Sequence, residues 1–159
     1  DSTFHLAATI AGRYPWILMK EMCAMEDVIW RGEQMHSFNF VFSARKGDGT
    51  PRSLWNDATG DIDPATFEHW KNYDISLYVR SNWQQLEPYL QGKIRVSVGN
   101  QDNFLLNYSV HLFDDEMKKI NAGFVFDYYP GDHFTVSTPE YKATGYQFLQ
   151  RKYNELKNK

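Results

Sequence analysis

The pattern of apolar and polar residues is most regular in the C-terminal part of the chain. "KIRVSVG" (93–99) and "FVFDYY" (124–129) are short runs of β-branched and aromatic residues, which is typical of strands. The segment after the first run predicts a helix with Gly123 as its C-cap. Its apolar face consists of Val110, Phe113, Met117 and Ile120. The segment after the second run predicts a closing helix, with Thr138 as N-cap and Pro139 at the first helical position. Alternating strands and helices with short loops favour parallel strands, so we expect an α/β fold.

The N-terminal part has a less regular pattern. Small and apolar residues at near-helical spacing predict a helix over Thr3–Arg13, which ends before Pro15. A short strand is expected at Ile17–Glu21, and aromatic residues alternate with smaller ones in "SFNFVFSA" (37–44), which favours another strand.

A long polar segment follows, between about residues 45 and 64, and it is rich in Gly, Asp, Asn, Pro and Thr. At its end, Asp63 and Pro64 are the N-cap and first residue of a predicted helix, and Trp83–Leu90 predict another. We interpret the segment as an insertion within a single domain, residues 1–159. Its neighbourhood is rich in large aromatic residues, which either pack on the rest of the domain or line a ligand site: Trp55, Trp70, Tyr73 and Trp83.

Composition excludes several classes of function. The chain has 159 residues, 42% of them hydrophobic, and a net charge of −3 with no basic stripe, so nucleic acid is not an expected partner. Cys23 is the single cysteine, and the five histidines lack the spacing of metal ligands, so we expect no metal and no cofactor. No apolar run approaches the ~20 residues that cross a membrane.

Two residues stand where functional groups collect in α/β sheets, just beyond the carboxyl ends of strands. Asp102 follows the strand that ends at Gly99, and His133 follows the strand that ends in "FDYY". If the strands are parallel neighbours, both loops open at the same edge of the sheet. An aspartate facing a histidine is the acid–base pair of a hydrolase triad, and Gly131 permits a tight turn before His133. Alternatively, Asp102 only caps the next helix and His133 is a surface residue.

The stretches "NWQQLEPYLQGKIRVSVGNQDNF" and "YPGDHF" resemble the C-terminal part of putative esterases of the α/β-hydrolase superfamily. The resemblance begins near His69 and is specific for the family but not for the substrate. It implies a partial α/β-hydrolase sheet of C-terminal parallel strands with flanking helices. It also implies that Asp102 is the triad acid and His133 the triad base, in a chain that acts on a small-molecule ester.

The nucleophile is missing from this pattern. Such esterases carry it in a G-x-S-x-G turn, and this chain has none. Ser2 is the remaining candidate, but Phe4 stands where glycine is expected and no strand precedes it. We therefore expect the chain to be the C-terminal half of a longer esterase, which pairs with its N-terminal half or with a second copy.

Two interpretations other than an esterase half remain open. The chain is a non-catalytic α/β domain that binds a partner or has a structural role, or it is a sugar-binding module. The aromatic content alone suggests the sugar-binding module. The sequence does not indicate the ester, the compartment or the oligomeric state.

Overall fold

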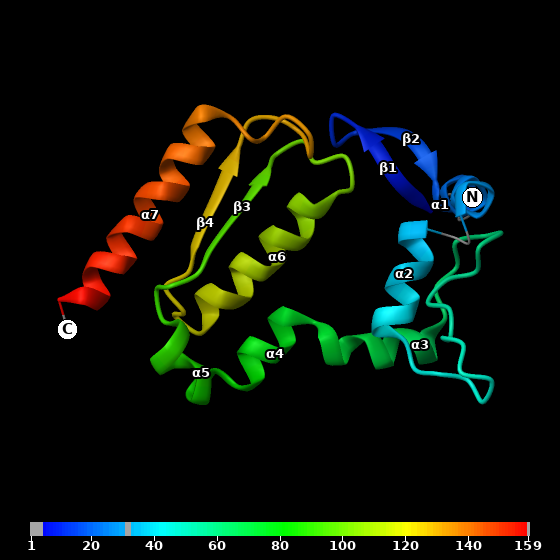
Figure 1. Ribbon diagram of the computed structural model, residues 1–159, viewed down its shortest axis with the longest axis horizontal. Coiled ribbons are helices and arrows are strands. Elements are labelled where there is room, and N and C mark those ends of the chain that lie inside the picture. The colour runs from blue at the N-terminus through cyan, green and yellow to red at the C-terminus, as the bar shows by residue number, and fades with distance from the viewer. Residues whose placement is uncertain (1–4, 31–32, 159) are drawn as a thin grey trace. The chain divides into compact units, whose positions relative to one another are not determined.

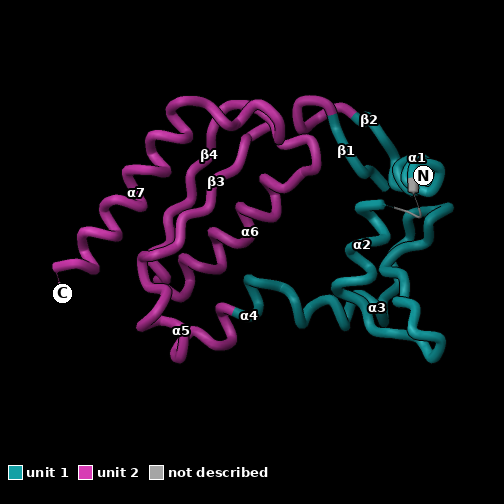
Figure 2. The backbone as a smooth tube through the Cα atoms, viewed as in Figure 1, with its two compact units in different colours: residues 1–9, 15–78 teal, residues 10–14, 79–159 magenta. Residues whose placement is uncertain are grey.

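The computed structural model describes residues 5–30 and 33–158, drawn in Figure 1. In chain order its elements are β1 (Leu6–Ile10), β2 (Tyr14–Leu18), α1 (Met19–Trp30), α2 (Glu33–Phe42), α3 (Pro64–Trp70), the 3-10 helix η1 (Lys71–Tyr73), α4 (Ile75–Ser81), α5 (Trp83–Leu90), β3 (Arg95–Gly99), α6 (Leu106–Lys119), β4 (Val125–Tyr129) and α7 (Pro139–Lys157). The chain divides into two compact units (Figure 2): unit 1, residues 1–9 and 15–78, and unit 2, residues 10–14 and 79–159. None of the helices within the described ranges is long and apolar enough to cross a membrane.

Unit 1 is organised around a cluster of aromatic rings. The ring of Phe42, at the end of α2, lies 5.2 Å from that of Trp70 and 5.3 Å from that of Tyr73. Trp55 is buried, and its ring lies 6.4 Å from that of Trp70. Asn39 of α2 accepts a hydrogen bond from the backbone N–H of Leu54 at 2.9 Å, which ties the long polar segment to the helix. Trp55 of the insertion and the aromatic residues on either side of it therefore pack within unit 1.

Unit 2 contains the strand, helix, strand, helix order that the sequence predicts. β3 and β4 are paired in parallel, with Arg95 opposite Val125 and Gly99 opposite Tyr129. Successive side chains of a strand point to opposite faces. On one face of the sheet, the ring of Phe126 in β4 packs against the ring of Phe113 in α6, with 5.4 Å between the ring centres. The neighbouring residue of β4, Asp127, faces the other way and pairs with Arg95 at 2.6 Å.

Two further observations explain how unit 2 is held together. Arg95 also donates to Thr144 of α7 at 3.0 Å, so it joins α7 to the sheet. The apolar core on the α6 side contains the buried residues Val79, Met117 and Ala122, with partly buried residues around them: Trp83, Leu86, Phe113, Ile120, Phe124 and Phe126. Three of the four residues of the predicted apolar face, Phe113, Met117 and Ile120, therefore lie in this core, and Trp83 packs against it.

The predicted helix over Thr3–Arg13 is wrong within the described residues. β1 and β2 form a two-stranded sheet there, connected by a turn at 11–13. Ala11 and Gly12 both have positive φ, 53° and 66°, which a helix excludes. The expected strand at Ile17–Glu21 is correct only as far as Leu18, because α1 begins at Met19.

The predicted strand over "SFNFVFSA" is also wrong, since α2 covers most of it. Phe38 and Phe42 are four residues apart, and their rings stack at 6.4 Å along one face of the helix. Aromatic residues at every second position, 38, 40 and 42, favoured a strand, although two of them also have the spacing of four residues that is typical of a helix face.

The observed caps and ends of α3, α5 and α7 agree with those predicted from the sequence. Asp63 accepts a hydrogen bond from the N–H of Thr66, Thr138 accepts one from Tyr141, and α5 spans the predicted residues. Gly123 is not the cap of α6, which ends at Lys119 and is followed by Ile120.

Candidate functional site

Asp102 is fixed in the loop between β3 and α6. It is 2% exposed, and its own N–H donates to the carbonyl of Gly99, the last residue of β3, at 3.2 Å. The carboxylate Oδ1 accepts hydrogen bonds from the backbone N–H groups of Phe104 at 2.9 Å and Leu106 at 3.3 Å. Leu106 is the first residue of α6, so this oxygen satisfies a donor at the start of the helix. The second carboxylate oxygen, Oδ2, is left for another partner.

That partner is His133, in the loop after β4. Its Nδ1 atom lies 2.9 Å from Oδ2 of Asp102. Because an ionised carboxylate only accepts, Nδ1 is the protonated nitrogen and Nε2 carries the lone pair. The side chain of His133 is 41% exposed, whereas that of Asp102 is 3% exposed. The structure therefore brings the two predicted residues together, with a buried acid behind a half-exposed imidazole.

The carboxylate of Asp102 makes two kinds of contact. One oxygen caps α6, and the other orients the histidine. A carboxylate held by backbone N–H groups cannot rotate freely, so the direction of its second oxygen is set before any substrate binds.

The loops are held against each other by backbone contacts. Gly131 accepts a hydrogen bond from the N–H of Gln101 at 3.0 Å, and Asn103 accepts one from the N–H of His133 at 3.2 Å. A Cβ atom at Gly99 would lie 2.5 Å from the carbonyl oxygen of Gly131. Gly131 itself has φ of 110°, which confirms the predicted turn that favours glycine. Glycine is required at both positions for this approach of the two loops.

Asp132 shapes the histidine loop from within. Its carboxylate accepts hydrogen bonds from the N–H groups of Phe134 and Thr135 and from the Thr135 hydroxyl, at 3.0, 2.9 and 2.8 Å. The hydroxyl of Thr135, together with the backbone donors, lowers the pKa of Asp132 below its usual range. The charged form of Asp132 therefore holds the turn that presents His133.

Two phenyl rings flank the imidazole. The ring of Phe104 meets that of His133 at 4.9 Å, edge to face, and the ring of Phe134 lies 5.5 Å from it. Phe134 is largely exposed. The imidazole of His133 therefore has two apolar rings beside it.

A segment from the N-terminal part of the chain borders the acid loop. In the turn between β1 and β2, the position of a Cβ atom at Gly12 would be 3.0 Å from Cα of Gln101. Ser2, the candidate nucleophile, lies outside the described residues. Within the described part of the chain, the Nε2 atom of His133 has no hydrogen-bond partner, and no serine hydroxyl reaches it. Ser97, in β3, has a buried hydroxyl without a partner.

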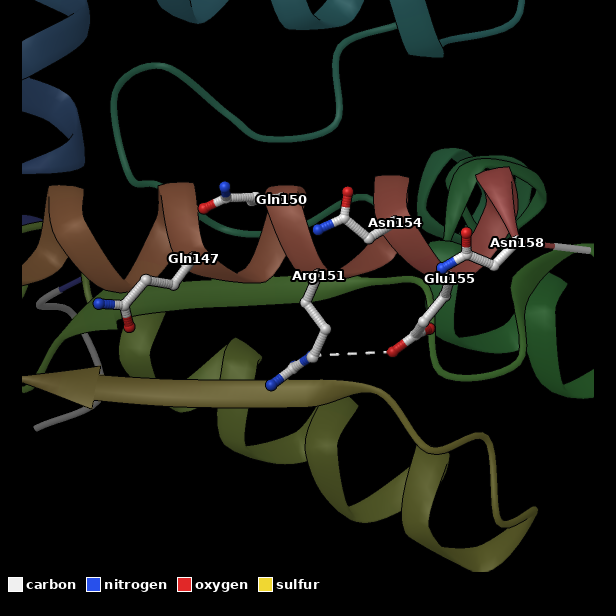
Figure 3. Close-up of a pocket in the computed structure, with 6 residues that line it drawn as sticks. All are labelled: Gln147, Gln150, Arg151, Asn154, Glu155 and Asn158. Atoms are coloured by element: carbon white, nitrogen blue, oxygen red, sulfur yellow. Dashed lines mark ion pairs between the residues drawn. The ribbon is translucent and has the colours of Figure 1, made fainter.

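Two further features of the described residues bear on where a site could lie. No group of three His, Cys, Asp or Glu side chains among residues 5–30 and 33–158 is arranged to hold a metal ion. A shallow hollow runs along α7 (Figure 3), and its lining residues come from that helix and its C-cap, Asn158: Gln147, Gln150, Arg151, Asn154, Glu155 and Asn158. It includes neither Asp102 nor His133.

Sequence reasoning missed the residues that support the pair. Asp132 carried a signal, because an aspartate followed by threonine three residues later is typical of such turns. Asn103 and Phe104 carried none, since their positions depend on Leu105, which adopts a left-handed φ of 60°.

Searches of protein-family models, curated proteins and solved structures found no match to this chain.

Proposed function

We propose that Asp102 and His133 are the acid and base of a serine carboxylic-ester hydrolase. The observation that carries the proposal is the 2.9 Å contact between Nδ1 of His133 and the buried carboxylate of Asp102, which leaves Nε2 free to accept a proton. The resemblance to putative esterases supports the same roles. The serine is supplied by residues that the structure does not describe: Ser2, the sequence upstream of Asp1, or a partner chain.

In this mechanism, Nε2 of His133 accepts the proton of the serine hydroxyl as the serine oxygen attacks the ester carbonyl carbon. The carboxylate of Asp102 stabilises the imidazolium that forms. The imidazolium then gives this proton to the departing alcohol and leaves an acyl-serine. A water molecule, deprotonated by the same Nε2 atom, attacks the acyl group, and the carboxylic acid is released with the serine restored. No metal or cofactor takes part.

Phe104 and Phe134 indicate the substrate class. Their rings border the imidazole on two sides, so a substituent next to the scissile ester bond would contact them. We therefore expect a small ester with an apolar acyl or alcohol group.

The alternative is a non-catalytic α/β domain in which the same contact joins two loops. The cap that Asp102 provides to α6 favours it, because this role requires no nucleophile. The two functions differ in the fate of a fluorophosphonate probe, which labels only an activated serine.

The test compares this chain with the chain extended by its natural upstream sequence. We expect the extended protein to be labelled by the probe and to hydrolyse p-nitrophenyl butyrate. His133→Gln should lower kcat/KM by about 10³-fold or more, since it removes the base. His111→Gln, which changes an exposed histidine of α6, is the matched control and should stay within twofold. Absence of labelling and hydrolysis in both folded proteins would establish the non-catalytic alternative.

A further inference from the structure

The loop between β3 and α6 contacts His133 at three points. This acid loop, residues 100–105, and the histidine loop, residues 130–138, follow the carboxyl ends of β3 and β4 (Figure 1). Oδ2 of Asp102 lies 2.9 Å from Nδ1 of His133, and Oδ1 of Asn103 accepts a hydrogen bond from the backbone N–H of His133 at 3.2 Å. The ring of Phe104 makes the third contact, with its centre 4.9 Å from that of the imidazole and the two planes perpendicular. Three consecutive residues of one loop therefore hold one histidine of the other.

The two hydrogen bonds alone do not fix the plane of the imidazole. The hydrogen bond to Asn103 holds the backbone of His133, and the hydrogen bond to Asp102 holds a single atom of the ring. The side chain of His133 is 41% exposed, so packing does not enclose the ring. A ring that is held at Nδ1 can still tilt about this atom, and the tilt moves Nε2. Since a displacement of about 1 Å in a reacting group can cost roughly 10²-fold in rate, a base needs a further restraint.

Phe104 is itself held by the carboxylate that binds the histidine. Its backbone N–H donates a hydrogen bond to Oδ1 of Asp102 at 2.9 Å. The next residue, Leu105, has φ of 60° and ψ of 21°, in the left-handed region that leucine rarely adopts. A strained residue persists only where its surroundings hold it, so the backbone around Phe104 is restrained. The position of the Phe104 ring is therefore set relative to Asp102, and its contact with His133 ties the imidazole to the acid.

The other neighbouring ring, that of Phe134, contacts the imidazole in a different way. It lies 5.5 Å from the imidazole, but Phe134 directly follows His133 in the chain and moves with it. Phe134 is 68% exposed, whereas Phe104 is 36% exposed. A ring on the histidine's own loop does not fix the imidazole relative to the acid loop. Phe134 is therefore a matched control for Phe104.

We propose that Phe104 is a positioning residue for His133. Its ring restrains the imidazole in the plane in which Nδ1 meets Asp102, and this plane sets the direction of the Nε2 lone pair. Perpendicular packing is a favoured arrangement of aromatic rings, so the contact favours this plane over tilted ones. The consequence for catalysis rests on the proposed esterase function, whereas the restraint of the ring is a property of this chain by itself.

NMR relaxation of the ¹³C-labelled imidazole of His133 tests the restraint in this chain. We expect an order parameter of about 0.8 in the wild type and below about 0.6 in Phe104→Ala. Phe134→Ala should keep the wild-type value, and so should Phe104→Tyr, which retains the ring. Circular dichroism checks that each variant is folded, and Phe104→Leu is a second variant without a ring. A mobile imidazole in the wild type, or an equal loss of order in Phe104→Ala and Phe134→Ala, would overturn the proposal.

Kinetics of the chain extended by its natural upstream sequence test the consequence for catalysis. Phe104→Ala should lower kcat by about 10–10²-fold, and by the same factor for p-nitrophenyl acetate and p-nitrophenyl butyrate, because the direction of the base does not depend on the acyl chain. Loss of a substrate contact would instead affect the longer ester more, and an effect limited to butyrate would refute the positioning role. An extended protein without any hydrolysis, in which Phe104→Ala still frees the imidazole, would refute the esterase function but not the restraint of His133.

Discussion

Among the residues that the structure describes, three histidines lie against aspartates, and the geometry of these contacts differs between the two units. In unit 1, Nε2 of His5 lies 3.2 Å from Asp61, and Nε2 of His36 lies 3.3 Å from Asp57. In unit 2, it is Nδ1 of His133 that meets the carboxylate. Both histidines of unit 1 therefore use Nε2, the nitrogen at the tip of the ring, and Nδ1 of His36 also lies 3.9 Å from Asp27, whereas His133 keeps its Nε2 available.

The acids differ as much as the histidines. The side chains of Asp61 and Asp57 are 70% and 45% exposed, so water competes for their oxygens, whereas Asp102 is buried and held by two backbone N–H groups. Solvent screens the exposed pairs, and they add little to stability. A histidine–carboxylate contact is thus a weak signal by itself. Burial of the acid and the choice of ring nitrogen distinguish the candidate site.

The largest expected effect comes from Asp102→Asn. Because Oδ1 must still accept from the N–H groups of Phe104 and Leu106, the new amide nitrogen faces His133 and donates to Nδ1. That forces the proton of the neutral ring onto Nε2, which can no longer act as a base. We expect kcat/KM of the extended protein for p-nitrophenyl butyrate to fall by about 10³–10⁴-fold. Long-range ¹⁵N NMR of the imidazole should show the change of tautomer.

Asp61→Asn is the matched control for this prediction, since it makes the same substitution at an aspartate that lies against a different histidine, His5. Its kcat/KM should remain within twofold of the wild type, and the tautomer of His133 should not change. If Asp102→Asn retained both the activity and the wild-type tautomer, the carboxylate would not be orienting the histidine.

Gly99→Ala should produce the next largest effect, on folding. The added Cβ atom would lie 2.5 Å from the carbonyl oxygen of Gly131 and 3.0 Å from that of Asp132, and both are backbone atoms that cannot rotate away. We expect the free energy of unfolding to fall by about 2–4 kcal/mol, measured by urea denaturation. Gly47→Ala, where a Cβ atom meets nothing within 4 Å, should change it by less than about 0.5 kcal/mol. Equal stability of the two variants would show that the acid and histidine loops are not in contact.

The same contrast between regions explains what the sequence could predict. In unit 2, the apolar patterns of β3, α6 and β4 and the Thr138 cap of α7 agree with the structure, so local pattern and tertiary structure give one answer. A topological rule predicted that Asp102 and His133 lie close together, because the loops after parallel neighbouring strands open at one edge, and the resemblance to esterases implied the same two residues.

Unit 1 offered no such agreement. Aromatic residues at 38, 40 and 42 fit both a strand and a helix, and packing of Phe42 against Trp70 decided for α2. The turn after β1, whose residues belong to unit 2, was missed for another reason: it depends on the left-handed Ala11, which no propensity favours. Within the site, two features depend on the exact conformation of the loops: the contact of Asp102 with Nδ1 of His133, and the positions of the neighbouring phenyl rings. The spacing of residues in the sequence does not predict such a conformation.

Asp132→Asn should give the smallest effect, and it is limited to one range of pH. Hydrogen bonds from Thr135 and Phe134 lower the pKa of Asp132, so its charged form is favoured by folding. The stabilisation is therefore complete above the carboxyl's unfolded pKa, near 4, and is lost as pH falls through the lower folded value. At pH 6 the variant, which keeps an acceptor but no charge, should melt at a slightly lower temperature than the wild type.

This difference in melting temperature should narrow to zero as the pH is lowered towards 2, because both side chains are then uncharged. Asp115→Asn, a change at an exposed carboxyl of α6, is the control and should lack this convergence. A constant difference between Asp132→Asn and the wild type from pH 6 to 2 would mean that the turn is held by the shape of the side chain. In that case, the charge of Asp132 would not contribute to presenting His133, and the orientation of the base would depend on Asp102, Asn103 and Phe104 alone.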